Sequence, residues 1–334
     1  MAYPTPIEWT DATWNPVGGC SIKSPGCVPC WAQQLAGTRL KHHPLYAGTT
    51  SPSPKDGRPL FNGTMTAAPD DADVWTWPFR WRGAAEPKLG PGMPSLIFVG
   101  DMSDVFHESR SAVTQRKTVV ATAASRHVGQ FLTKRPDVMA MRIEDLRLHR
   151  WTGIASRDEH TRARFWFGTS AERQKEFDER WPHLRKLAAL GFIVFISYEP
   201  AMGPLKLPDD FLALGDRAWV IAGGCSGAHA WPAHPAWFRA VRDQCAAAGV
   251  PFFFKQWGEW APGMPARSGE PGEFALFYED SRCIYLDESP RHFARFGATA
   301  HMTRVGKQAA GHLLDGVEHR AFPRVAAAAI GAAA

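Results

Sequence analysis

The sequence predicts an α/β fold, a partial or nearly closed TIM-type (βα) barrel of about six to seven parallel strands. Two observations support this prediction. Short apolar runs rich in aromatic and β-branched residues recur roughly every 26 to 35 residues, the length of a strand, a helix and two loops. The segments between these runs carry apolar residues at helical spacing. A doubly wound open sheet is the competing topology.

The first element expected is a strand at residues 7–9, followed by a cysteine-containing loop and a helix that starts at Trp31. Residues 41–94 are rich in Pro, Gly, Ser and Asp and keep no period of 2 or 3.6, so we expect an insertion there, such as a lid. The regular pattern then predicts strands at 95–99, 129–132, 164–167, 192–196, 219–222 and 251–254, and helices at 112–125, 172–190 and 235–248. The chain is expected to form one domain over residues 1–323, with an alanine-rich tail at 324–334.

Composition restricts the class of protein. The 334 residues are 45% hydrophobic, enough for a sizeable core, and their formal charge is +5. No apolar run approaches the ~20 residues that a membrane helix needs, and the chain does not open on a signal-peptide pattern. We therefore expect a cytoplasmic enzyme without a membrane partner. The positive charge is compatible with a polyanionic substrate but does not require one.

Three of the six cysteines, Cys20, Cys27 and Cys30, lie in one short loop with Cys-x6-Cys-x2-Cys spacing. The other three are scattered, which favours metal ligation over a disulfide framework. Three thiolates from one loop can hold three irons of a 4Fe–4S cluster and leave the fourth iron free for a small molecule. The glycines and prolines of this loop suit a backbone that wraps closely around metal and sulfur.

Each predicted strand after the first runs into polar residues at its carboxyl end. These strand ends are residues 100–104, 133–135, 168–172, 197–199, 223–227 and 255–259. Helix caps and turns could account for any one of them. Six consecutive polar strand ends are better explained by a ligand site on this face of the sheet.

Several phrases of the sequence resemble the radical S-adenosylmethionine superfamily, and within it a phage-associated three-cysteine-motif family that is distantly similar to spore photoproduct lyase. These phrases are residues 7–16, 20–31, 102–107, 132–136, 198–200, 223–227, 253–258 and 304–311. The resemblance spans residues 7–323. It departs from the usual Cys-x3-Cys-x2-Cys signature in its first gap, and Pro29 stands where an aromatic residue usually precedes the last cysteine.

The resemblance implies an enzyme, of lyase or transferase type, with two cofactors, a 4Fe–4S cluster on the three cysteines and S-adenosylmethionine. Reductive cleavage of S-adenosylmethionine would generate a 5'-deoxyadenosyl radical that abstracts hydrogen from a substrate. The electron would come from a donor such as flavodoxin or ferredoxin. The protein would chelate, orient and shield these groups.

The resemblance and the strand order together assign roles at the site. The residues expected to bind S-adenosylmethionine are Asp101, Ser103 and Asp104 for its amino group, Lys134, Ser170 and Glu172 for its carboxylate and ribose, Gly223 and Gly224 for adenine, and also Glu199, which borders the substrate pocket. The substrate residues expected are Arg135, Lys255, Gln256 and Trp257. Tyr198 and Cys225 are the catalytic candidates, because a phenol or a thiol can return a hydrogen atom to a substrate radical, although a free cysteine is also a common core residue.

Nucleic acid or a nucleotide-like molecule is the leading substrate class, since basic and aromatic residues mix at 75–82 and 291–307. A second hypothesis is a non-enzymatic zinc or iron–sulfur module that binds nucleic acid or a protein, with His42 or His43 as a fourth ligand. A third is an electron carrier that holds the cluster without S-adenosylmethionine.

Overall fold

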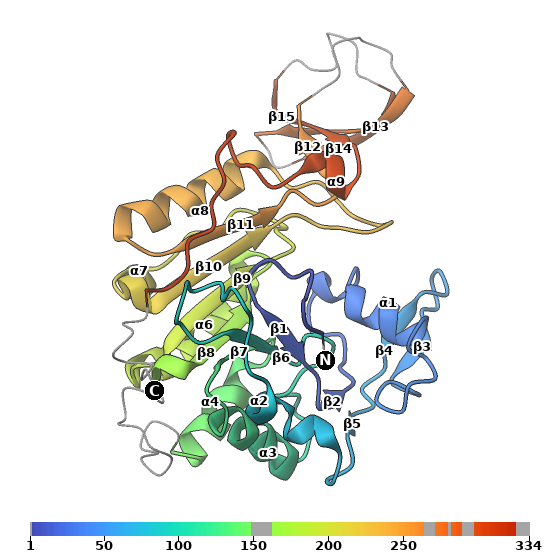
Figure 1. Ribbon diagram of the computed structural model, residues 1–334. Coiled ribbons are helices and arrows are strands. Elements are labelled where there is room, and N and C mark those ends of the chain that lie inside the picture. Colours follow the sequence, from blue (N-terminus) through green and yellow to red (C-terminus); the bar gives the residue numbers. More distant parts are fainter. Residues whose placement is uncertain (1, 148–161, 264–270, 280–281, 289–296, 325–334) are drawn as a thin grey trace.

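The centre of the computed structural model is a seven-stranded sheet (Figure 1). The structure describes residues 2–147, 162–263, 271–279, 282–288 and 297–324. All neighbouring strands are parallel and follow chain order: β1 (Ala12–Trp14), β6 (Leu96–Val99), β7 (Val128–Thr133), β8 (Phe165–Ser170), β9 (Ile193–Tyr198), β10 (Ala218–Gly223) and β11 (Phe252–Gln256). A doubly wound sheet reverses its strand order part-way, so this order confirms the partial barrel.

The longer helices cover one face of the sheet, and the sheet curls away from them into a half-barrel (Figure 1). They are α3 (Ala112–Ala123), α4 (Pro136–Asp145), α6 (Gln174–Ala189) and α8 (Pro235–Ala248), with α7 (Asp209–Leu212) and the 3-10 turn η4 (Gly215–Arg217) between β9 and β10. The expected helices 112–125, 172–190 and 235–248 are all present. Helix α4, which is ten residues long, was not expected from the sequence.

The concave face of the sheet is filled by aromatic side chains over the first part of the strands. Residues alternate between the two faces of a strand, which places Phe98, Phe195 and Trp219 in one buried cluster on this face. Trp9 joins them, with ring centroids 4.6 Å from Phe98 and 6.2 Å from Trp219. Towards the carboxyl ends the same face carries small or polar residues such as Ser170, so that a cavity opens there.

The first strand lies three residues beyond the segment that was expected. Residues 7–9 end in a turn, and β1 starts at Ala12. The alternation of Ile7 and Trp9 resembled a strand, but Trp9 instead fills the concave cluster and the Thr10 hydroxyl donates to Leu96 O at 3.1 Å. This correction moves the start of β1 closer to the cysteine loop.

The long connection from β1 to β6 holds the cysteine loop and the expected insertion. Its elements are β2 (Val17–Gly18), η1 (Pro25–Cys27), α1 (Trp31–Gly37), β3 (Thr50–Pro52), β4 (Pro59–Phe61), β5 (Thr66–Ala67), η2 (Asp73–Trp75) and α2 (Trp77–Arg80). β3 pairs with β4, β5 pairs with β2, and α1 packs on β3 and β4. The insertion therefore supports the cysteine loop from the side, as the group of α1, β3 and β4 in Figure 1 shows.

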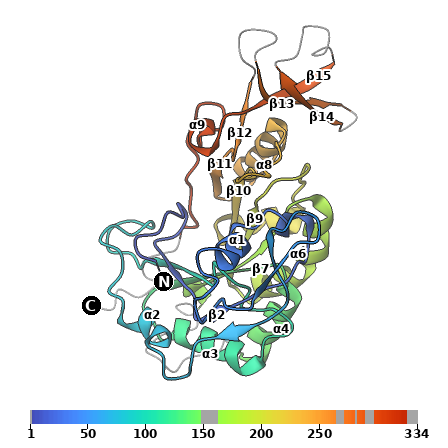
Figure 2. The ribbon, with the colours of Figure 1, turned by 90° about the vertical axis from the view of Figure 1, so that its right-hand side faces the viewer.

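A second, antiparallel sheet lies beyond β11 and was not expected. Its strands, in spatial order, are β12 (Trp260–Pro262), β15 (Ala298–Arg304), β13 (Pro271–Tyr278) and β14 (Cys283–Glu288). Figures 1 and 2 both show it projecting from the half-barrel. After the short helix α9 (Lys307–Ala310), the chain returns along β11, where Phe254 N donates to His319 O at 2.9 Å. This return covers the edge of the last strand.

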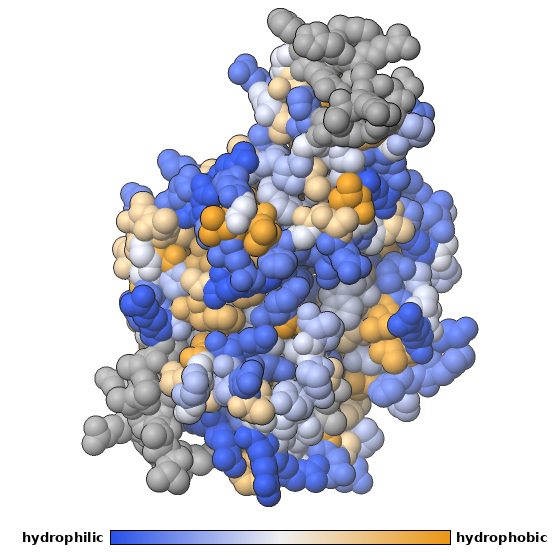
Figure 3. All heavy atoms as spheres, turned by 45° about the horizontal axis from the view of Figure 1, so that its top comes forward, coloured by the Kyte–Doolittle hydropathy of each residue, from blue (hydrophilic) through white to orange (hydrophobic). Residues whose placement is uncertain are grey.

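The outer surface shows no large apolar area on the face drawn in Figure 3, where hydrophobic residues form small patches among hydrophilic ones. Scattered apolar residues of this kind are normal on protein surfaces. Within the described ranges, no helix has the length and hydropathy to cross a membrane. The tail expected at 324–334 lies outside the described residues, apart from Arg324.

Candidate functional site

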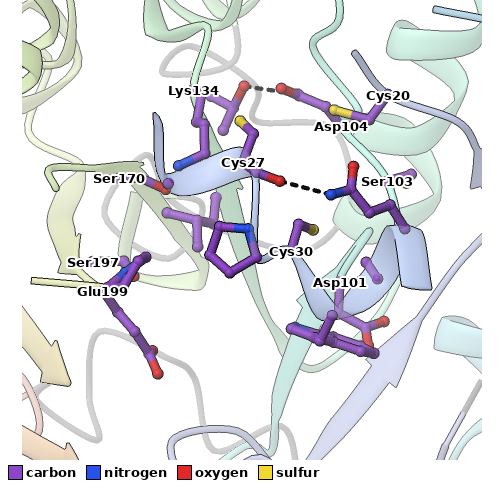
Figure 4. A pocket seen from close by; sticks show the side chains of 18 of the residues that line it. Cys20, Cys27, Cys30, Asp101, Ser103, Asp104, Lys134, Ser170, Ser197 and Glu199 are labelled. Carbon is purple, nitrogen blue, oxygen red and sulfur yellow. Dashed lines mark hydrogen bonds between the residues drawn. The ribbon is translucent and has the colours of Figure 1, made fainter. Parts of the chain in front are cut away.

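A cavity of about 260 Å³ opens at the carboxyl ends of the parallel strands, and the cysteine loop forms one of its walls. Most of the residues that the sequence predicts for the site line it: Cys20, Cys27, Cys30, Asp101, Ser103, Asp104, Lys134, Ser170, Glu199, Gly224, Cys225 and Lys255. In Figure 4, Cys20 lies next to Asp104, whereas Cys27 and Cys30 lie between these residues and Asp101 on one side and Lys134, Ser170 and Glu199 on the other. The topology therefore brings most of the predicted strand ends to one place.

Backbone and side-chain donors point at the sulfur atoms of the cysteine loop. Lys23 N lies 3.4 Å from Cys27 Sγ, and Arg135 Nη1 lies 3.9 Å from Cys20 Sγ. Cys30 is the N-cap of α1, where backbone N–H groups partly offset the effect of burial on its thiol. Hydrogen bonds of this kind stabilise thiolates and tune iron–sulfur clusters.

The thiols lie in a desolvated setting that opposes ionisation. Burial, together with the nearby Asp104 carboxylate, raises the pKa of Cys20 to about 12, although Arg135 acts in the opposite direction. Burial also raises the pKa of Cys30. A bound metal must displace these protons, because thiolates are the metal-binding form.

No disulfide joins the six cysteines. Among the described residues, no group of three or more His, Cys, Asp and Glu side chains converges as ligands of a single ion.

A buried carboxylate anchors the middle of the loop. Glu172 is fully buried and accepts hydrogen bonds from Ser24 Oγ at 2.5 Å, from Arg180 Nη1 at 2.7 Å and from Lys134 Nζ. Burial opposes the charge of Glu172, but Lys134 and Arg180 outweigh it and lower the pKa to about 2. A Cβ on Gly26 would lie 2.6 Å from the Glu172 side chain, so the loop packs directly on this carboxylate.

Glu172 and Lys134, both expected to bind the cofactor, are thus paired with each other, and only Lys134 also lines the cavity. Two features make this arrangement hard to predict from the sequence. The ion pair joins residues 38 positions apart, and Arg180 lies within α6, where the helical pattern gave no sign of a role in the loop.

The acidic wall of the cavity is held by neighbouring polar groups. Asp101 Oδ1 accepts from Asn15 Nδ2 at 2.5 Å, and burial raises the pKa of Asp101. Asp104 accepts from Thr133 Oγ1 at 2.7 Å and from Arg135 Nη1 at 3.0 Å. These contacts fix both carboxylates at the cavity.

The Ser103 hydroxyl, in the same wall, is buried and has no hydrogen-bond partner among the residues that the structure describes. A buried polar group without a partner is costly. A bound ligand with a polar group at this wall would remove that cost.

The wall opposite the acidic residues combines an ion pair with a thiol. Lys255 Nζ lies 2.8 Å from Glu199 Oε1, and both side chains are mostly buried. Cys225 is buried next to them in the lining, and burial raises the pKa of its thiol to about 11. Ser197, at the end of β9, also lines this wall and was not singled out from the sequence, although it shares a strand face with Glu199.

The glycines expected to receive adenine are already packed against protein atoms. A Cβ on Gly224 would lie 1.8 Å from Trp257 O, and one on Gly223 would lie 3.1 Å from Glu199 Oε1. The absence of side chains there lets the loop after β10 pack against the loop after β11. Gly224 still contributes to the cavity lining, whereas Gly223 does not.

Four further predicted residues lie outside the cavity lining. Tyr198 faces the helices, where its hydroxyl donates to Gly203 O and its ring packs on Phe238. Trp257 packs on Phe238 and donates to Leu313 O at 2.8 Å. Strand alternation explains why Tyr198 and Gln256 lie outside the cavity, because their neighbours Ser197 and Lys255 occupy the concave face. Arg135 is directed to the cysteine loop instead.

The elements proposed for other roles lie away from the cavity. His42 and His43 are exposed and do not line it, and His43 Nδ1 accepts from Leu45 N. The aromatic and basic segment 75–82 leads to the amino ends of the strands. There Trp81 packs on His127, with ring centroids 4.6 Å apart. Segment 291–307 lies partly outside the described residues.

Comparison with known proteins gives a family and a weak structural similarity. A family model described as "Protein of unknown function (DUF5131)" matches residues 4–323. A solved structure of mutant spore photoproduct lyase with bound AdoMet and dinucleoside spore photoproduct is similar at a TM-score of 0.39 and 11% identity. That alignment covers 76% of this chain and 61% of the other. No curated protein matches the chain.

Proposed function

The chain belongs to the family of proteins of unknown function DUF5131, and from its site we propose that it is a radical S-adenosylmethionine enzyme. In this proposal Cys20, Cys27 and Cys30 bind a 4Fe–4S cluster. One observation carries the proposal: three free cysteines of a single loop border one cavity at the carboxyl ends of a curled parallel sheet.

The surroundings of the cysteines fit such a cluster. N–H donors from Lys23 and Arg135 point at two of the sulfurs, and the third cysteine caps a helix. Among the described residues of the lining, Cys225 is the one Cys or His side chain besides these three cysteines, and it belongs to the opposite wall. This arrangement suits a cluster with three protein ligands and one free iron.

When bound, the cluster and S-adenosylmethionine would supply one-electron reductive chemistry. The residues of the chain bind and orient S-adenosylmethionine. Asp101 and the partnerless Ser103 hydroxyl offer acceptors for the amino group of the methionyl part. Lys134 offers a cation for its carboxylate, held in place by Glu172. Trp31 and Pro29 add apolar surface to the lining beside Cys30.

The substrate is assigned to the wall with Lys255, Glu199 and Cys225. Its chemistry, a cation and a carboxylate in contact beside a neutral thiol, suits a polar substrate. We retain nucleic acid or a nucleotide-like molecule as the substrate class, supported by the lysines in the cavity and the formal charge of +5. The electron donor is assigned to the flavodoxin or ferredoxin class.

Anaerobic reconstitution tests this function. The wild-type protein should bind iron and sulfide in equal amounts and, with dithionite, convert S-adenosylmethionine to 5'-deoxyadenosine. Single alanine variants of Cys20, Cys27 and Cys30 should lose iron, whereas Cys283→Ala, on the outlying β14, should keep it. Stoichiometric zinc without iron would instead identify a zinc module. Iron and sulfide without cofactor cleavage would identify an electron carrier.

A further inference from the structure

Arg135 contacts the cysteine loop, although the sequence placed it among the substrate residues. Its side chain is 2% exposed and lies between Cys20 and two carboxylates. We propose that Arg135 is a positioning residue that makes the cluster easier to reduce by holding a positive charge and an N–H donor at the Cys20 sulfur. This inference rests on the proposed function.

The contacts of the guanidinium group hold it in one orientation. Nη1 lies 3.9 Å from Cys20 Sγ and 3.0 Å from Asp104 Oδ2, while Nη2 donates to Ser21 Oγ at 2.7 Å. Nε donates to Glu108. A planar guanidinium has donors in a fixed fork, so these partners direct one N–H towards the sulfur.

The residue after Cys20 is held by the same group. Ser21 Oγ lies 2.7 Å from His107 Nε2 as well as 2.7 Å from Arg135 Nη2. His107 Nδ1 accepts from Ser109 N at 3.1 Å, which assigns the ring proton of neutral His107 to Nε2 and makes Ser21 the acceptor. Arg135 and His107 thus both hold the hydroxyl of Ser21, the residue that follows Cys20.

The other buried cations near the loop have different partners. Lys134 pairs with Glu172, whose side chain packs against Gly26. Arg110 donates to the backbone carbonyls of Gly18 and Thr66, at 2.8 Å and 2.7 Å. Arg135 is the cation whose hydrogen bond reaches a cysteine sulfur among the described residues.

Charge determines the direction of the effect. Reduction adds one electron to the cluster, taken from an external one-electron donor that is thereby oxidised, and Arg135 itself is unchanged. A cation and an N–H donor at a ligating sulfur stabilise the more negative, reduced state. Asp104, on the same side, acts against it, and Figure 4 shows Asp104 next to Cys20.

The midpoint potential of the reconstituted cluster tests the inference, followed by EPR in a redox titration. At a fixed applied potential, Arg135→Gln should lower the ratio of reduced to oxidised cluster about tenfold. For one electron this corresponds to a midpoint potential that is about 59 mV more negative. Arg135→Lys should recover part of the shift. Asp104→Asn should shift the potential in the opposite direction.

Arg164→Gln is the matched control. Arg164 is also partly buried, but its Nη1 donates to Ser125 O at the amino ends of the strands. Its removal should leave the potential unchanged. An equal shift in this variant would mean that loss of any buried arginine perturbs the cluster, which would overturn the role of Arg135.

Iron and sulfide analysis separates the two proposals. A wild-type protein without a cluster contradicts the proposed function. A full cluster whose potential is the same in the wild type and in Arg135→Gln contradicts only the present inference. If Arg135→Gln cannot hold iron, the midpoint potentials of Arg135→Lys and Glu108→Gln test the role of Arg135 instead. Wild-type potentials in both of these variants would also contradict that role. Glu108→Gln removes a negative charge beside Arg135, so the midpoint potential of the cluster in this variant should rise.

Discussion

At the scale of single residues, the cysteine loop depends on charges buried beneath it. Glu172 receives three donors from separate parts of the chain, and two of these donors are cations. An unpaired buried charge is costly, so each member of this group requires the others. The cysteine spacing was readable from the sequence, but this support was not, because the pairing of Glu172 with Lys134 and Arg180 appears only once β7, β8 and α6 are packed together.

Replacement of Glu172 by Gln should therefore destabilise the apo protein by roughly 3–5 kcal/mol, since Lys134 and Arg180 would lose their anion. The measurement is the free energy of unfolding from urea denaturation at neutral pH. A loss below about 1 kcal/mol would show that these charges are solvated and do not hold the loop.

The same carboxylate predicts a pH dependence. The pKa of Glu172 is lowered from 4.5 to about 2 in the folded state. A depressed folded pKa gives stability that is complete above the unfolded pKa and is lost as pH falls through 4.5 towards 2. Wild-type stability should decline over this window more steeply than that of Glu172→Gln, when both are measured by urea denaturation at several pH values. Parallel pH profiles would contradict the assignment.

Gly26→Ala tests the contact between the loop and Glu172. The added Cβ would lie 2.6 Å from the carboxyl side chain, which is too close, so the loop must move. We expect a loss of about 1–3 kcal/mol and a reduced iron content after reconstitution. In Gly203→Ala, the control, the new Cβ meets only Arg173 Cγ at 3.6 Å, an ordinary contact. Normal iron binding in Gly26→Ala would contradict the close packing.

At the scale of elements, strand alternation decides which residues reach the cavity. The strands after the first were located from apolar runs to within one to three residues, and their carboxyl ends were correctly identified as a common face. The sequence does not show which of two adjacent polar residues at a strand end points inward. Ser197 and Glu199 reach the cavity, whereas Tyr198, between them, faces α8.

Tyr198→Phe follows from this orientation. It removes the hydrogen bond to Gly203 O and should cost about 0.5–1.5 kcal/mol. Formation of 5'-deoxyadenosine by the reconstituted variant should match the wild type, because the hydroxyl lies outside the cavity. Chromatography of the cleavage product checks this. A large fall in cleavage with unchanged stability would return Tyr198 to the catalytic group.

At the scale of the whole molecule, the sequential order of seven parallel strands places every strand end on one side. The regular spacing of βα units made this architecture predictable. The antiparallel sheet of β12 to β15 was not, because its strands are not separated by helices and so lack the longer spacing that marked the barrel. The return of residues 311–322 along β11 depends on contacts between distant segments, which no local pattern records.

The central claim is that the three cysteines hold a cluster with one iron open to S-adenosylmethionine. The most direct test is the EPR spectrum of the reduced, reconstituted wild-type protein before and after S-adenosylmethionine is added. Our account predicts a 4Fe–4S signal that changes shape when the cofactor binds. A protein without such a signal, or a signal that the cofactor leaves unchanged, would contradict it.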